Sequence, residues 1–240
     1  MSNANITAHG SKSIKWQSAA MLGAVLALTG CNSTNSTLGE PTIALSSVDV
    51  VSTASYAYAP IVDDDISLPA FDYTKMRERY LRRVVSLRTR YKAGTIIVDT
   101  TGPFLYLVQR GGKAIRYGIA VGKEGFEWSG DAVVKRKTKW PTWTPPAEMI
   151  ARSPKLAAYA DGMPAGIQNP LGARAMYLFK DGKDTMYRIH GTNYPLSIGK
   201  NASSGCFRMI NQDVIDLYER VKPGAKVIVR HAPPTYTENR

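Results

Sequence analysis

Alternation of apolar and polar residues, rather than a helical spacing, is the main pattern in the second half of the chain. Two runs rich in β-branched and aromatic residues, TIIVDT and FLYLVQR, are separated by TGP, which predicts a β-hairpin. Further runs of this kind follow, and a turn is expected at Asp181 and Gly182 between two of them. Strands are therefore predicted within residues 95–100, 104–110, 114–122, 131–140, 169–182, 185–192 and 225–230.

Helical spacing is confined to short stretches. Residues 211–224 (NQDVIDLYERVKPG) combine an apolar stripe with Asn211 as the expected N-cap and a Pro-Gly stop, so a helix is predicted there. Residues 140–150 contain three prolines and two tryptophans, which predicts a shaped loop that leads into a short helix at 146–152. Together these signals predict a mostly β domain with a few short helices over residues 94–231.

The N-terminal 31 residues have the pattern of a secretory signal. Lys12 and Lys15 precede an apolar run of twelve residues, AAMLGAVLALTG, which is too short to span a bilayer as a helix. The run leads into LTGC, which resembles the bacterial lipobox, in which the cysteine is acylated and becomes the new N-terminus. This predicts a lipidated Cys31 and a protein anchored to a membrane in the cell envelope. A plain signal peptide with an incidental cysteine is the alternative.

The segments beside the predicted domain differ from it in composition. Residues 32–70 are rich in Ser, Thr, Ala and Asn and poor in large apolar residues, which predicts a flexible tether. Residues 71–93 are strongly basic, and their apolar positions fit either a helical stripe or, around RRVVSL, a first strand. Residues 232–240 are expected to form a short tail. With lipid on Cys31, the domain should face the periplasm, at the outer membrane rather than the inner, because no Asp follows the cysteine.

Charge and residue counts narrow the classes of partner. The chain contains 31 Lys and Arg against 19 Asp and Glu, a formal net charge of +12. Such a charge favours acidic partners, and a solvated cationic surface explains it equally well. The sequence has no phosphate-binding loop or nucleic-acid motif, and its three histidines and two cysteines are too scattered for a metal cluster. No nucleic acid, cofactor or metal is therefore expected.

Cysteine usage singles out one thiol. If Cys31 carries lipid, Cys206 is the one thiol left in an exported chain, although oxidising compartments normally pair their cysteines. His190 lies sixteen positions before it, at the end of a predicted strand, and Cys206 lies in a Gly-containing turn ahead of the predicted helix. We expect the imidazole to take the thiol proton, which gives a thiolate–imidazolium pair able to attack a carbonyl.

The neighbours of this pair suit acyl transfer. The backbone N–H groups of Ser204, Gly205 and Cys206 are candidate donors to an oxyanion. The carbonyl of Gly191 is expected to bind the second ring nitrogen of His190 and to fix its tautomer, since no Asp or Glu lies between the His and the Cys. A buried cysteine and a hydrogen-bonded core histidine are the structural alternative.

IHGT followed by SSGCFRM resembles the signature of the L,D-transpeptidase catalytic domain (YkuD-type), in which a His-Gly pair precedes a [Ser/Thr]-x-Gly-Cys-x-Arg block. The resemblance covers about residues 94–230 and implies a β-sandwich-like or barrel-like catalytic fold. The positions that match the family's motif are His190, Gly191, Ser203, Ser204, Gly205, Cys206 and Arg208. The resemblance implies that Cys206 is the nucleophile, that His190 is the base, and that Arg208 shapes the pocket and meets a substrate carboxylate. Many members have His where this chain has Ser204.

The resemblance also implies peptidoglycan chemistry without a cofactor. The nucleophile would attack the L-centre carbonyl of diaminopimelate in a stem tetrapeptide, release D-Ala and pass the acyl group on. The acceptor stays open: a diaminopimelate amine gives a 3→3 cross-link, an envelope-protein amine gives a protein–wall anchor, and water gives trimming. A sortase-like or other cysteine acyltransferase or peptidase, and a non-catalytic wall-binding lipoprotein, are the alternatives. Four aromatic residues are candidates for a cleft wall or for the core: Tyr106, Trp128, Trp140 and Trp143.

Overall fold

The part of the chain that the computed structural model describes consists of residues 54–122, 128–202 and 206–231. All of it belongs to one compact unit, Ala44–Arg240. The expected signal segment with Cys31 and the expected tail lie outside the described residues. None of the helices in the described ranges has the length and apolar character that crossing a bilayer requires.

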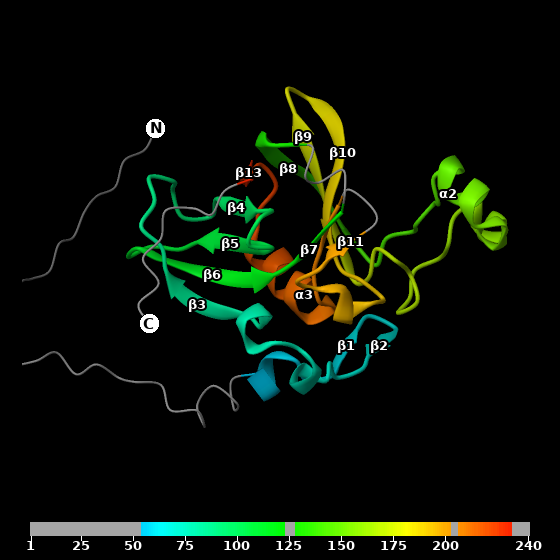
Figure 1. Cartoon of the computed structure of the whole chain (residues 1–240), viewed down its shortest axis with the longest axis horizontal. Helices are drawn as coiled ribbons and strands as arrows, with labels where there is room; N and C mark the ends of the chain where they lie inside the picture. Colours follow the sequence, from blue (N-terminus) through cyan, green and yellow to red (C-terminus); the bar gives the residue numbers. More distant parts are fainter. Residues whose placement is uncertain (1–53, 123–127, 203–205, 232–240) are drawn as a thin grey trace, which may run out of the picture. The chain divides into compact units, whose positions relative to one another are not determined.

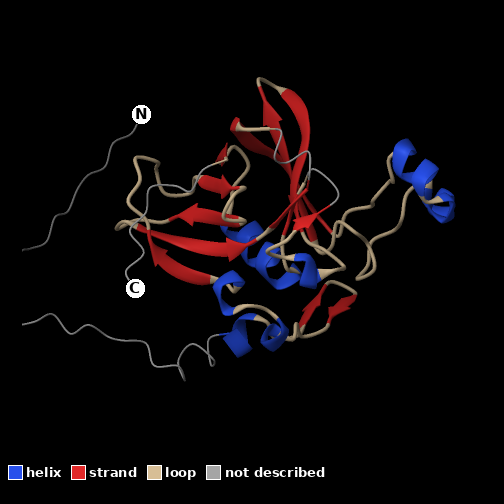
Figure 2. Cartoon of the chain, viewed as in Figure 1, coloured by secondary structure: helices blue, strands red, loops and turns tan. Residues whose placement is uncertain are grey.

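Strands contain more of the described residues than helices do, and the helices are short (Figure 2). The strands are β1 (Ile61–Asp63), β2 (Ile66–Leu68), β3 (Arg83–Ser86), β4 (Ile96–Asp99), β5 (Phe104–Val108), β6 (Lys113–Gly118), β7 (Ala120–Gly122), β8 (Gly130–Lys139), β9 (Arg174–Lys180), β10 (Lys183–His190), β11 (Asn201–Ala202), β12 (Phe207–Arg208) and β13 (Lys226–Arg230). The α-helices are α2 (Ala147–Arg152) and α3 (Asn211–Arg220), and the 3-10 turns are η1 (Tyr73–Lys75), η2 (Glu78–Tyr80), η4 (Pro154–Tyr159) and η5 (Pro195–Ser197). The mostly β class predicted from the sequence is confirmed.

Eleven of these strands, counted within the described ranges, form one mixed sheet in the order β11-β7-β12-β10-β9-β8-β13-β4-β5-β6-β3 (Figure 1). Strand β6 lies near one edge of this order and β7 near the other, although a single residue, Ile119, separates them in sequence. The sheet therefore curls so that its two ends approach each other at Ile119. A large, mixed sheet of this kind is the mostly β architecture that the family resemblance implies.

The main core includes side chains from both halves of the curled sheet and from α3. Val214, Leu217 and Val221 recur at helical spacing and are at most 2% exposed. Burial of each such side chain contributes about 1.5–3 kcal/mol. Pro223, which cannot continue a helix, follows α3 closely. The predicted C-terminal helix is thus confirmed.

The expected N-cap role of Asn211 is wrong. Ile210 occupies the N-cap position, and Asn211 is the first residue of α3. The Asn211 side chain instead accepts hydrogen bonds from the backbone N–H groups of Ala173 and Thr192. These tertiary contacts occupy the oxygen that a cap would use.

The β9–β10 hairpin turns where the sequence predicts. Asp181 and Gly182 have φ values of +48° and +78°, as a two-residue turn between antiparallel strands requires. Strand β10 also contains a register shift between Asp184 and Arg188, close to its His190 end. A bulge of this kind changes the direction of the side chains that follow it.

The flexible tether predicted over residues 32–70 is wrong in its described part. Residues 54–70 pack on the domain, with Tyr58 and Leu68 at most 5% exposed, and β1 pairs with β2. Widely spaced large side chains carry this packing, so the low apolar density of the segment concealed it.

The basic segment 71–93 contains a strand, which was one of the two predicted alternatives, and the helical alternative is wrong. Strand β3 pairs antiparallel with β6 at the edge of the sheet. We call residues 54–92 the strap, because this segment precedes the first inner strand, β4, and packs against several elements of the domain.

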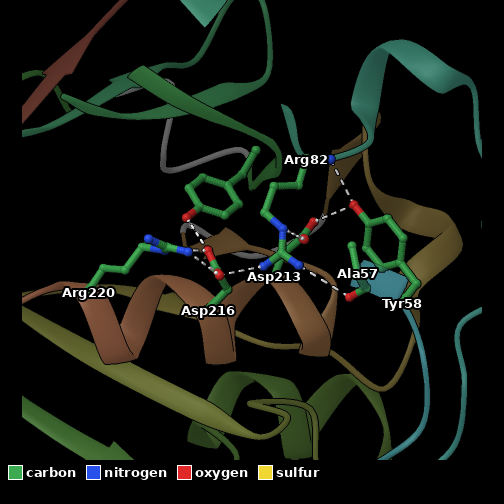
Figure 3. Close-up of polar contacts among 7 residues, drawn as sticks. Ala57, Tyr58, Arg82, Asp213, Asp216 and Arg220 are labelled. Atoms are coloured by element: carbon green, nitrogen blue, oxygen red, sulfur yellow. Dashed lines mark hydrogen bonds and ion pairs between the residues drawn. The ribbon is translucent and has the colours of Figure 1, made fainter. Parts of the chain in front are cut away.

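Partly buried ion pairs connect the strap to α3 (Figure 3). Arg82 places Nη1 3.0 Å from Asp216 and Nε 3.7 Å from the fully buried Asp213. The hydroxyl of Tyr58 donates to Asp213 at 3.2 Å and accepts from the backbone N–H of Arg82 at 2.8 Å. The strap is therefore fixed to the helix that directly follows β12.

Candidate active site

The pairing of β10 with β12 brings the predicted catalytic pair to neighbouring strands. His190 is the last residue of β10, and Cys206 directly precedes β12. These two strands run parallel, with Ile189 opposite Phe207 and His190 opposite Arg208. After the segment that follows His190, the chain therefore comes back beside β10 as strand β12.

Side-chain alternation places His190 and Arg208 on one face of the β10–β12 ladder. Ile189 and Phe207 point into the main core, where both are 0% exposed. Neighbouring residues in a strand point to opposite faces, so His190 and Arg208, which lie opposite each other, share the other face. Cys206 directly precedes this strand, two positions before Arg208.

His190 is buried, and one hydrogen bond fixes its tautomer. Its Nδ1 lies 2.6 Å from the carbonyl oxygen of Gly191. Because a carbonyl oxygen only accepts, Nδ1 carries the proton, and Nε2 holds the lone pair of the neutral ring. The contact that the sequence predicts between Gly191 and His190 is confirmed.

The protonation state of His190 differs from the sequence-based expectation. Burial lowers the pKa of this imidazole to about 4, and the Arg208 and Arg188 guanidinium groups act in the same direction. The hydrogen bond to Gly191 opposes them without outweighing them. The resting ring is therefore neutral at pH 7. The imidazolium of the expected thiolate–imidazolium pair is disfavoured, because it is desolvated and close to two cations.

Arg208 lies beside the pair and is half-buried. Burial lowers the pKa of its guanidinium, and the nearby Cys206 acts in the opposite direction. This opposing effect is the attraction between a cation and the negative form of a sulfur. The half-buried Cys206 therefore lies within the electrostatic reach of Arg208.

Arg188 is a further residue of this face that the motif did not single out. It lies two positions before His190 on β10, so its side chain projects to the same side. Its two terminal nitrogens lie 2.6 and 2.9 Å from the carboxylate of Asp184, and its guanidinium carbon lies 4.5 Å from the centre of the Tyr177 ring. The period-2 spacing from His190 was the signal in the sequence that could have found it.

Ser203, Ser204 and Gly205 lie outside the described residues, so their expected roles as oxyanion donors and pocket residues stay predictions. The next residue, Cys206, is described, and its carbonyl accepts a hydrogen bond from the backbone N–H of Gly122 at 3.3 Å. This bond attaches the start of the cysteine segment to β7.

Two of the aromatic residues considered for a cleft wall belong to the interior. Tyr106 is fully buried, and Trp140 is 8% exposed. The Nε1 of Trp140 donates to the strap residue Asp63 at 2.7 Å. Trp128 stacks on Tyr187, with ring centroids 4.9 Å apart, against the main core.

A pocket of about 250 Å³ lies beside the loop that follows His190. The strap, the loop before β9, residues 192–195 and the start of α3 all line it, and the side chains involved include Phe71, Ile167, Thr192, Pro195 and Gln212. Among the described residues, no group of three or more His, Cys, Asp or Glu side chains is arranged to hold a metal ion.

Comparison with known proteins assigns the family. The model of the L,D-transpeptidase catalytic domain (YkuD) matches residues 93–229, which include β4 to β12, all but the last residue of β13, and the residues of the candidate site. The chain belongs to this family of L,D-transpeptidase catalytic domains.

Two relatives from Escherichia coli K12 carry the same family name. "Probable L,D-transpeptidase ErfK/SrfK" is 37% identical over 125 residues, which cover 50% of this chain and 38% of the relative. "Probable L,D-transpeptidase YbiS" is 34% identical over 138 residues, which cover 55% of this chain and 43% of the relative. The chain thus spans less than half the length of either relative.

A crystal structure from Brucella melitensis, described as a probable carnitine operon oxidoreductase CaiA, is 49% identical to this chain. The match covers 66% of this chain and 99% of that one, with a TM-score of 0.45.

Proposed function

We propose that this protein is a cysteine L,D-transpeptidase that takes an acyl group from peptidoglycan stem tetrapeptides through a thioester on Cys206. The observation that carries the proposal is a neutral His190, protonated on Nδ1, opposite Arg208 in the β10–β12 ladder, with Cys206 directly before β12. Membership of the family, and the names of the two Escherichia coli relatives, support the same class of enzyme.

In the first half-reaction, the sulfur of Cys206 attacks the L-centre carbonyl of diaminopimelate. The S–C bond forms while the thiol proton passes to Nε2 of His190, because Nδ1 is committed to the Gly191 carbonyl. The C–N bond to D-Ala then breaks, and the proton on Nε2 leaves with the amine of D-Ala. A ring with a pKa of about 4 returns a proton readily, which suits uptake and release within one half-reaction.

In the second half-reaction, an amine attacks the thioester, gives its proton to Nε2 and expels the Cys206 sulfur, which regains that proton. A diaminopimelate amine then gives a 3→3 cross-link, and the amine of an envelope protein gives attachment to the wall. Arg208 is assigned to a carboxylate of the stem peptide, since a guanidinium binds carboxylates with two parallel hydrogen bonds. The N–H groups of Ser204, Gly205 and Cys206 are assigned to the oxyanion, and Ser203 to the pocket.

Release of D-Ala from purified tetrapeptide muropeptides tests this function. Cys206→Ala should abolish release, and His190→Gln should lower its rate by about 10²–10⁴-fold, as removal of a general base does. His231→Gln is the matched control and should leave the rate unchanged, because His231 contacts Thr100 rather than the candidate site.

Other outcomes point to other classes of protein. Release that persists in Cys206→Ala contradicts the proposal. Cleavage of sorting-type peptides in place of tetrapeptides would favour a sortase-like enzyme. Binding to isolated walls without D-Ala release, unchanged in Cys206→Ala, would favour a non-catalytic wall-binding lipoprotein.

We also propose that the mature protein is anchored by lipid on Cys31 and faces the periplasm, with the outer membrane as its site. The LTGC sequence after a short apolar run supports this, and so does the Asn that follows the cysteine. Mass spectrometry of the mature N-terminus should find an acylated Cys31, and Cys31→Ala should move the protein out of the outer-membrane fraction. An unmodified N-terminus at another residue would contradict the anchor.

A further inference from the structure

Asn211 connects the segment that carries Cys206 to the loop that follows His190. It begins α3, five positions after the cysteine, and is 7% exposed. Its Oδ1 accepts from the backbone N–H of Thr192 at 3.2 Å, and its Nδ2 donates to the carbonyl of Thr192 at 3.0 Å. Oδ1 also accepts from the N–H of Ala173 at 3.0 Å. One side-chain amide thus holds three backbone groups from two other segments.

The peptide group between Gly191 and Thr192 is held from both sides. Its N–H end donates to Asn211, and its C=O end accepts from Nδ1 of His190 at 2.6 Å. In a trans peptide the N–H and the C=O point in opposite directions, so fixing one end fixes the direction of the other. Asn211 therefore determines where the Gly191 carbonyl points.

The Asn211 amide packs closely against the backbone of two glycines, Gly172 and Gly191. A Cβ built on Gly191 would lie 2.2 Å from Oδ1 of Asn211, and so would one built on Gly172. The φ of Gly191 is not in the left-handed region, so this close approach, rather than backbone conformation, requires glycine there.

We propose that Asn211 is a positioning residue: it keeps the Gly191 carbonyl on Nδ1 of His190, so that Nε2 stays available to accept a proton. This inference rests on the proposed function, in which Nε2 takes the proton of the Cys206 thiol. It adds a residue that lies outside the His-Gly and Gly-Cys motifs and acts on the base rather than on the substrate.

Amide variants of two neighbouring residues test this role. Asn211→Ala and Asn211→Leu, the second similar in size to Asn, both remove all three hydrogen bonds. Gln212→Ala and Gln212→Leu are the matched controls. Gln212 is the next residue of α3 and is 4% exposed, but its Nε2 donates to Pro69 in the strap and not to the loop after His190.

The first readout does not require activity. Imidazole ¹⁵N NMR spectra, assigned by comparison with His190→Gln, report which ring nitrogen carries the proton. Wild type and both Gln212 variants should show His190 protonated on Nδ1. Asn211→Ala and Asn211→Leu should lose this signature. If thermal unfolding shows that Asn211→Ala is not folded, Asn211→Leu decides.

The second readout is kinetic. The Asn211 variants should lower kcat for D-Ala release about tenfold or more with little change in KM, because a misdirected base weakens the transition state rather than substrate binding. The Gln212 variants should stay within about twofold of wild type. Folded Asn211 variants that keep the Nδ1 proton and a normal kcat would overturn the inference. A wild-type protein that releases no D-Ala would instead overturn the proposed function, and the NMR result would still decide the role of Asn211.

Discussion

The imidazole of His190 determines the acid limit of the proposed reaction. Only its neutral form accepts a proton, and burial, with the Arg208 and Arg188 cations, lowers its pKa to about 4. We therefore expect kcat/KM for D-Ala release to fall as the pH decreases through about 4. Initial rates between pH 3.5 and 7 measure this decrease in kcat/KM. A decrease centred near pH 6.5, the ordinary pKa of histidine, would contradict a buried ring flanked by two cations.

The sequence could predict the part of the site that lies in short, local motifs. His190, Gly191, Cys206 and Arg208 were found because their chemistry and spacing lie in two short motifs, and the Gly191 contact is between neighbouring residues. Asn211 was misassigned, because a local rule for helix starts favours Asn as a cap. Its actual partners are backbone groups of two distant loops, which only the folded sheet brings to the start of α3.

Arg82 links two elements, the strap and α3. It lies 3.7 Å from the fully buried Asp213 and 3.0 Å from Asp216. We expect Arg82→Met to lower the free energy of unfolding by about 1–3 kcal/mol at pH 8 and by less at pH 5, because Asp213, with a pKa of about 7, carries a proton at the lower pH and then needs no cation. Urea denaturation at pH 5 and pH 8 measures this change.

The adjacent Arg83 provides the control for this prediction. It pairs with Glu78 at 3.4 Å, and both side chains are well exposed, so Arg83→Met should change stability by no more than about 1 kcal/mol. In a double-mutant cycle, Asp213→Asn should recover part of the loss caused by Arg82→Met. Equal effects of Arg82→Met and Arg83→Met would show that the buried pair does not fix the strap.

At the scale of elements, alternation and turn residues predicted most strands, the Asp181–Gly182 turn and α3. The strap was missed because its buried side chains are few, and a window of sequence shows mainly small and polar residues. The break at Ile119 was also missed. The run AIRYGIAVG alternates without interruption, but its two halves pair with opposite ends of the curled sheet, and alternation does not encode the partner of a strand.

Two buried groups give opposite pH dependence to the stability of the whole molecule. The pKa of His190 is lowered to about 4 from 6.5, and burial, with Asp216 adding to it, raises that of Asp213 from 3.8 to about 7 against the effects of Arg82 and Tyr58. Between these values the unfolded chain binds the extra proton at His190, so this residue makes stability rise with pH. The folded protein binds the extra proton at Asp213, so that residue makes stability fall with pH.

The two effects therefore largely cancel in wild type between about pH 4 and 6.5, and single substitutions should reveal each one. Asp213→Asn should give a free energy of unfolding that rises with pH relative to wild type, and His190→Gln one that falls, each by up to roughly 3 kcal/mol across this range. Urea denaturation at a series of pH values measures both differences, and other carboxylates cancel in the subtraction. The Arg83→Met curve should run parallel to wild type, because both buried groups remain. Curves for Asp213→Asn and wild type that also run parallel would mean that the folded protein does not hold a proton on Asp213, and that the ion pair with Arg82 outweighs burial.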